Sequence, residues 1–141
     1  MKVLQAGTEN QLQDAFNIRK KVFVEEQNVP IEIEIDEHEN SSAHFVLYDK
    51  ETPAGAGRFR VLDGKGKVER ICILPEYRGN GAGIQIMEEI EEYAKKLPVD
   101  ELVLNAQSYA VPFYEKLGYS VISDEFLDAG IPHRKMKKKL E

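Results

Sequence analysis

Hydrophobic and polar residues alternate along this chain with two different periods, which predict strands and helices in turn. Lys2 to Ala6 is typical of a strand, and Thr8-Glu9-Asn10-Gln11 has the form of a capping box that opens a helix. The next side chains on one face of that helix are Leu12, Ala15, Phe16, Arg19, Val22 and Phe23. We therefore expect this face to pack in the core.

The segment from Pro30 to Asn40 breaks the periodic pattern. It is acidic and irregular, with carboxylates placed around alternating isoleucines. We expect it to form a loop over a site. Its acidic residues are Glu32, Glu34, Asp36, Glu37 and Glu39.

Strands and helices alternate through the rest of the chain, separated by turns rich in glycine or proline. The predicted strands are Ala43 to Asp49, Ala54 to Leu62, Lys67 to Leu74, Glu101 to Asn105, Tyr119 to Ile122 and Arg134 to Leu140. A long helix has Ile84, Met87, Ile90, Ala94 and Leu97 on one face, and a short one runs from Ala110 to Leu117. The order β-α-β-β-β-α-β-α-β-β predicts an α/β (α+β) fold, a mixed sheet with helices on its faces.

Composition narrows the class of protein. The chain has 141 residues, 42% of them hydrophobic, which suits a single domain over residues 1–141 without a membrane span. A net charge of −6 argues against a nucleic-acid partner, and we interpret the basic run from Arg134 to Lys139 as a solvated strand. With a lone cysteine, Cys72, and no secretory signal, we expect a cytoplasmic protein.

The segment with the clearest chemistry is a strand, then Arg-Gly-Asn-Gly-Ala-Gly at residues 78–83, then a helix. Glycines let the backbone approach a ligand closely, and the following helix adds free N–H groups and its dipole, so the turn is suited to bind phosphate. Arg78 adds a cation. A tight structural turn remains the alternative, and the segment lacks the features of a nucleoside-triphosphate loop or a dinucleotide site.

This segment resembles the coenzyme A motif of the GNAT-type N-acetyltransferases. The resemblance rests on Val68 to Gly83 (VERICILPEYRGNGAG) and on Ala110 to Tyr119 (AVPFYEKLGY), which is similar to a second family motif. Further stretches resemble the YjcF/ElaA-type branch of small bacterial GNAT proteins, so that the likeness covers nearly the whole chain. They are Arg19 to Pro30, Ala106 to Ala110 and Gly130 to His133.

The resemblance implies a mostly antiparallel GNAT-like sheet and transfer of an acetyl group from acetyl-CoA to an amine in a ternary complex. It implies that backbone groups of Ile71, Cys72 and Ile73 pair with the pantetheine arm. The amides that would hold the pyrophosphate are those of Arg78, Gly79, Asn80, Gly81, Ala82 and Gly83. Gln107 stands where family members often have asparagine, so its contact with the cofactor is a hypothesis. An acyl-CoA-binding or regulatory module is the alternative function.

Three catalytic roles follow from that reaction. Tyr114 matches the family tyrosine that gives a proton to the departing sulfur, although its position also fits a core aromatic residue. A backbone N–H, with that of Ile73 as the first candidate, would stabilise the oxyanion. Glu69, expected on the strand face of Ile71 and Ile73, and Glu26 are the candidate bases, each with the alternative of a salt-bridged carboxylate.

Other residues carry weaker expectations. His133 follows a turn at one end of the predicted sheet and is the histidine to test as a substrate or proton-relay residue, with an ordinary turn histidine as the alternative. The three histidines lack metal-ligand spacing, so we expect no metal. The acceptor is expected to be a small-molecule or peptide amine, for which the acidic loop would suit a cation. The preferred acyl group and a possible homodimer stay open.

Overall fold

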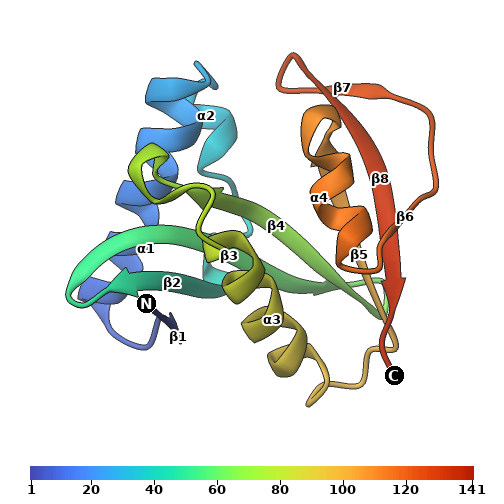
Figure 1. Cartoon of the computed structure of the whole chain (residues 1–141), viewed down its shortest axis with the longest axis horizontal. Helices are drawn as coiled ribbons and strands as arrows, with labels where there is room; N and C mark the ends of the chain where they lie inside the picture. Colours follow the sequence, from blue (N-terminus) through green and yellow to red (C-terminus); the bar gives the residue numbers. More distant parts are fainter.

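The computed structural model describes residues 1–141 as one twisted, eight-stranded sheet with helices on both faces (Figure 1). The elements in chain order are β1 (Lys2–Gln5), α1 (Glu9–Arg19), η1 (Lys20–Glu26), α2 (Ile31–Glu34), η2 (Glu39–Ser41), β2 (Ala43–Asp49), β3 (Thr52–Leu62), β4 (Lys65–Ile73), η3 (Pro75–Tyr77), α3 (Ala82–Ala94), β5 (Glu101–Gln107), η4 (Ser108–Ala110), α4 (Val111–Lys116), β6 (Ser120–Val121), β7 (Phe126–Asp128) and β8 (Ile131–Lys139). The mixed, mostly antiparallel sheet expected from the sequence is confirmed.

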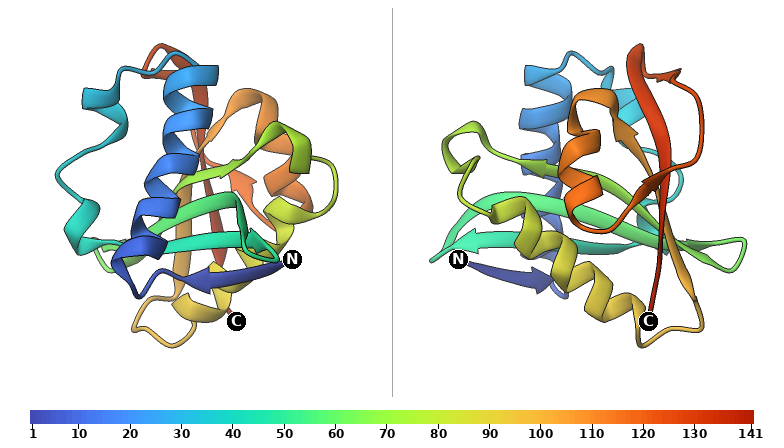
Figure 2. Two further views of the ribbon diagram at one scale, coloured as in Figure 1. Left: turned by 90° about the vertical axis from the view of Figure 1, so that its left-hand side faces the viewer. Right: turned by 45° about the vertical axis from the view of Figure 1, so that its right-hand side comes forward.

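The strand order is β1-β2-β3-β4-β5-β8-β6, and β7 pairs with β8 beside this path. Every pair is antiparallel except β4 with β5. That parallel pair extends only from Gly66–Leu102 to Val68–Leu104. Beyond Val68 the two strands separate, as the right-hand view of Figure 2 shows, and the sheet opens at one end.

Each face of the sheet has its own apolar core. On one face α1 and η1 cover β2, β3 and β4, and the cluster includes Ile18, Val22, Ala56 and Cys72. On the other face α3 and α4 cover the middle of the sheet, with a cluster of 16 buried residues. The predicted capping box is confirmed, because Thr8 Oγ1 accepts from the Gln11 backbone at 3.2 Å and Gln11 Oε1 accepts from the Thr8 backbone at 3.2 Å.

The first helix ends differently from the prediction. The α-helical face expected through Phe23 changes at Lys20 into a π-helix that continues to Glu26. The Gln27 N–H donates to the Val22 carbonyl at 3.1 Å, which is the i→i−5 bond of this wider turn. Residues after Arg19 are therefore rotated from the positions that a period of 3.6 assigns to them.

The C-terminal strands correct two further expectations. β8 begins at Ile131 rather than Arg134, and β7, which was not predicted, pairs with it. Ala129 and Gly130 join them with φ values of +52° and +77°, as a two-residue hairpin turn of mirror-image type requires. The basic run lies in an interior strand whose Met136 is buried while Lys135, Lys137 and Lys139 are exposed.

Close packing of α3 against the sheet leads to a stability prediction at Gly57. A Cβ atom there would lie 2.7 Å from Ile71 Cδ1 and 3.1 Å from both Ile86 Cγ2 and Ile90 Cδ1. We expect Gly57→Ala to lower the free energy of unfolding by about 1–3 kcal/mol, the usual cost of overpacking, measured by urea denaturation. Gly7→Ala is the control, since its Cβ would meet only Gln11 Oε1 at 3.9 Å. Equal stability of the two variants would contradict this packing.

Candidate active site

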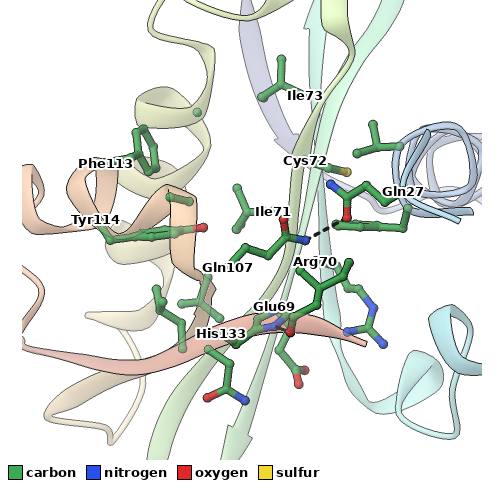
Figure 3. A pocket seen from close by; sticks show the side chains of 18 of the residues that line it. Gln27, Glu69, Arg70, Ile71, Cys72, Ile73, Gln107, Phe113, Tyr114 and His133 are labelled. Carbon is green, nitrogen blue, oxygen red and sulfur yellow. Dashed lines mark hydrogen bonds between the residues drawn. The ribbon is translucent and has the colours of Figure 1, made fainter. Parts of the chain in front are cut away.

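A cleft of about 590 Å³ occupies the opening between β4 and β5. Its walls come from η1 and α2 on one side, the glycine turn and α3 with α4 on the other, and the β7–β8 hairpin at one end (Figure 3). Most of the expected site residues line it: Glu69, Ile71, Cys72, Ile73, Arg78, Gly79, Gly81, Ala82, Gly83, Gln107, Tyr114 and His133. Asn80 and Glu26 are not part of the lining.

A bulge in β4 corrects the expected direction of Glu69. Ala56 and Arg58, two residues apart on β3, pair with Cys72 and Glu69, which are three residues apart on β4. The extra residue is accommodated at Arg70, whose φ is +59°. Glu69 therefore lies on the α1 face with Cys72, whereas Ile71 and Ile73 pack against the α3 side. A regular alternation, which the sequence suggested, would have put Glu69 with the two isoleucines.

The glycine turn leads directly into α3 with its backbone open to the cleft. Gly79 and Gly81 have φ values of +83° and +77°, a left-handed conformation that glycine adopts without strain. The first helical hydrogen bond is donated by Gln85 to the Gly81 carbonyl at 3.1 Å. The N–H groups of the first helical turn, from Ala82 to Ile84, therefore have no partner within the helix. They and the helix dipole favour an anion at this point.

Arg78 is paired within the protein rather than free. Its guanidinium binds both Glu26 carboxylate oxygens, at 2.7 and 2.8 Å, and its Nε donates to the Ile73 carbonyl at 2.9 Å. The hydrogen bond from Arg78 lowers the pKa of Glu26. This pair closes one edge of the cleft between the end of η1 and the end of β4, and it disfavours Glu26 as a base.

Glu69 is also held by cations. Its carboxylate accepts hydrogen bonds from Arg58 Nη2 and Arg60 Nε, both at 2.9 Å, and Lys67 Nζ lies 3.8 Å away. Burial acts to raise the pKa of Glu69, but the hydrogen bond from Arg60 and the neighbouring positive charges outweigh it and lower that pKa. A carboxylate stabilised in this way is a weaker base, so the general-base role of Glu69 stays an untested prediction.

Tyr114 is buried on α4 with its hydroxyl at the cleft. Its ring makes edge contacts with Phe113 and Tyr119, at centroid distances of 5.0 and 5.9 Å, so it is part of the core as well as of the cleft wall. Burial raises the pKa of the phenol, which keeps it protonated at neutral pH. The hydroxyl has no hydrogen-bond partner within the protein and is not fully occluded, so it reaches the cleft.

A polar bridge crosses the cleft that sequence reasoning did not foresee. Gln107 Nε2 on β5 donates to Gln27 Oε1 at 2.8 Å, and Gln27 follows the π-helix directly (Figure 3). Gln107 was named from the family motif as a possible cofactor contact. Nothing in the periodicity points to Gln27. Its placement depends on the π-helix and on Asn28, whose φ is +61°.

The acidic segment is neutralised by buried arginines. Arg19 from α1 binds Glu34 Oε1 and Glu39 Oε2, each at 2.8 Å, and Arg58 from β3 binds Asp36 Oδ1 at 2.8 Å. Neither arginine side chain is exposed to solvent. The segment is thus folded onto the α1 face, and its first part is helical, not irregular as expected. Glu34, Asp36 and Glu39 are therefore paired within the protein, whereas Glu32 and Glu37 of the same segment stay exposed.

The thiol of Cys72 is buried on the α1 face. Burial raises the pKa of the Cys72 thiol to about 12, so it is not a ready nucleophile. No group of three or more His, Cys, Asp or Glu side chains is arranged to hold a metal ion. No helix is long and apolar enough to cross a membrane.

Comparison with known proteins decides the family. The family described as "Acetyltransferase (GNAT) domain" matches residues 3–140. The chain belongs to the GNAT acetyltransferases. It is 56% identical over 139 residues, covering 98% of this chain and 99% of the other, to the Bacillus subtilis (strain 168) protein named "Uncharacterized N-acetyltransferase YjcF". The family match and this relative together assign the chain as an N-acetyltransferase.

Two solved structures show how widely the GNAT fold is shared. Escherichia coli ElaA superposes with a TM-score of 0.88 at 22% identity, covering 98% of this chain and 99% of that one. An aminoglycoside 6′-N-acetyltransferase complexed with coenzyme A gives a TM-score of 0.77 at 12% identity, covering 100% and 98% of the two chains. At these identities the likeness establishes the fold.

The arginine-bound acidic segment gives a pH prediction. Burial acts to raise the pKa of Glu39, but the hydrogen bonds from Arg19 outweigh it and lower that pKa from 4.5 to about 2. A depressed carboxylate pKa contributes stability that is present above the unfolded pKa and lost as the pH falls through the folded value. We therefore expect the free energy of unfolding to fall by up to about 3 kcal/mol from this group between pH 4.5 and 2.

Urea denaturation at a series of pH values measures this dependence. Glu39→Gln should be less stable at neutral pH and show a flatter decline in acid, because the titrating group is gone. Glu37→Gln is the control, since the Glu37 side chain is 86% exposed and contacts only His38. The same acid decline in Glu39→Gln as in the wild type would rule out the assignment to Glu39.

Proposed function

We propose that this GNAT N-acetyltransferase binds acetyl-CoA in the cleft between β4 and β5 and transfers the acetyl group directly to an amine. The observation that carries the proposal is the combination of a free strand edge and a glycine turn in one cleft. β4 has no partner on its β5 side after Val68, and the open backbone of Gly79 to Gly83 adjoins that edge. Coenzyme A needs both features, one for its amide-rich pantetheine arm and one for its pyrophosphate.

The backbone from Ile71 to Ile73 would hold the pantetheine arm as an added strand. The bulge at Arg70 supports this, because it separates the end of β4 from β5 and leaves an edge whose groups are not used in the sheet. The Arg78 bond to the Ile73 carbonyl and the pair with Glu26 would have to rearrange if that carbonyl accepted from the pantetheine. Arg78 would then be available for phosphate oxygens. The N–H of Ile73 is the proposed oxyanion donor.

Acetyl-CoA supplies a thioester carbonyl, which an uncharged amine attacks. Tyr114 is the proposed acid for the sulfur that departs when the carbon–sulfur bond breaks. Its hydroxyl faces the cleft, and burial raises its pKa, so it holds its proton at neutral pH and can donate it to the developing thiolate. The proposed acceptor is a small-molecule or peptide amine, which would lie beside the α2 and β7–β8 residues that line the cleft.

Replacement of Tyr114 by Phe tests the proposed acid. We expect Tyr114→Phe to lower kcat by about 10²-fold, with little change in acetyl-CoA affinity, because only the hydroxyl is removed. The measurement is release of free thiol from acetyl-CoA in the presence of an amine, with affinity from calorimetry. Tyr119→Phe is the matched control, since Tyr119 is also a buried tyrosine but does not line the cleft.

The outcome also separates an enzyme from a binding module. A module would bind acetyl-CoA in every variant and release no thiol in any of them. Equal kcat values for the wild type and Tyr114→Phe would remove Tyr114 from the reaction and leave the rest of the proposal in place.

A further inference from the structure

We propose that His133 is the base that takes the proton from the acceptor amine. This inference rests on the proposed acetyl transfer and names a residue for the step that neither Glu69 nor Glu26 fits. It is carried by the position of His133, by the hydrogen bond that fixes its ring, and by the free nitrogen that remains.

His133 lies in the middle of three paired strands. In the sheet register it stands opposite Gln107 of β5 on one side and Phe126 of β7 on the other. Its ring stacks on Phe126, with an interplanar angle of 26° and a centroid distance of 6.1 Å. The residue is only 8% exposed and lines the same cleft as Tyr114 and Gln107 (Figure 3). A surface turn histidine would lack these constraints.

One hydrogen bond determines which ring nitrogen is free. His133 Nδ1 lies 2.7 Å from the Ile131 carbonyl oxygen. A carbonyl oxygen can only accept, so Nδ1 carries the hydrogen and the neutral ring has its lone pair on Nε2. Nε2 has no hydrogen-bond partner within the protein. Unlike His44 Nδ1, which is fully occluded, it remains accessible. The lone pair is therefore open to the cleft.

Most other titratable groups of the cleft are bound to partners or carry a positive charge. Glu69 and Glu34 are paired with arginines, and Cys72 is a buried thiol. Lys67, Arg70 and Arg78 are cations, and Asp128 on β7 is an exposed carboxylate. The nearby positive charges hold Glu69 in its ionised, hydrogen-bonded state, whereas nothing donates to His133 Nε2. Asp128 is exposed to solvent, whereas His133 is buried, so His133 Nε2 is the unpartnered base held inside the cleft.

The proton and electron balance of the step is simple. The amine nitrogen forms a bond to the thioester carbon, and His133 Nε2 takes one proton from that nitrogen. The carbon–sulfur bond then breaks, and the sulfur leaves with the electron pair and takes the Tyr114 proton. His133 returns its proton to solvent, and Tyr114 regains one from solvent, so both residues are restored.

The experiment compares wild-type protein with His133→Asn, an amide that can still donate to the Ile131 carbonyl. The probes are acetyl-CoA and primary amines of three kinds: a polyamine, an aminoglycoside and a lysine-containing peptide. We expect kcat with the best of these amines to fall by about 10²-fold or more, with unchanged acetyl-CoA affinity. His38→Asn, a histidine outside the cleft lining, should keep wild-type kcat.

Two further readouts separate a base from a structural residue. Imidazole added to the medium should restore activity to His133→Ala. In ¹⁵N NMR spectra of the free wild-type protein, the neutral His133 ring should carry its hydrogen on Nδ1. A kcat for His133→Asn within about threefold of the wild type, or a neutral ring with its hydrogen on Nε2, would overturn the proposal. If the wild type transfers no acetyl group to any amine, the proposed function fails, and the NMR result still judges the ring by itself.

Discussion

The structure depends on one interruption in the hydrogen bonding of its sheet. β4 and β5 pair as parallel strands from Gly66 to Val68, and the pairing stops after Val68. The bulge at Arg70 increases the local bend of β4, and the glycine turn carries the chain away into α3. A continuous sheet would satisfy more backbone groups internally. The open edge is therefore a feature that a ligand with amide groups can use.

The side chains around this opening fall into two environments. Towards α3 and α4 the walls are apolar or backbone, with Ile71, Ile73 and Phe113 beside the glycine turn. Towards α1 the buried arginines Arg19 and Arg58 bind the acidic segment and Glu69. Buried charges cost desolvation energy, which only close pairing and hydrogen bonds repay, so this cluster must stay intact. It holds one wall of the cleft through α2, and it uses carboxylates that would otherwise be available for catalysis.

Sequence patterns predicted the parts of the fold that follow a single period. The alternation of helices and strands, the capping box at Thr8 and the glycine turn at residues 78–83 all depend on local chemistry, and each was read correctly. The family resemblance named the residues expected to hold the cofactor, and most of them line one cleft. The pattern failed where a residue breaks the period. The π-helix after Arg19 rotates the residues that follow it, and the bulge at Arg70 puts Glu69 on the opposite face from Ile71 and Ile73.

Pairing partners were equally hidden from the sequence. From the sequence, Glu26 and Glu69 could each act as a base. Their arginine partners lie 52 and 11 positions away along the chain, and only folding brings them together.

Direct evidence for the central claim would come from calorimetric titration of the purified protein with acetyl-CoA. One molecule bound per chain with micromolar affinity is the result that this account predicts. Absence of binding up to millimolar acetyl-CoA would contradict it, because the free edge of β4 and the glycine turn would then have no coenzyme A to hold.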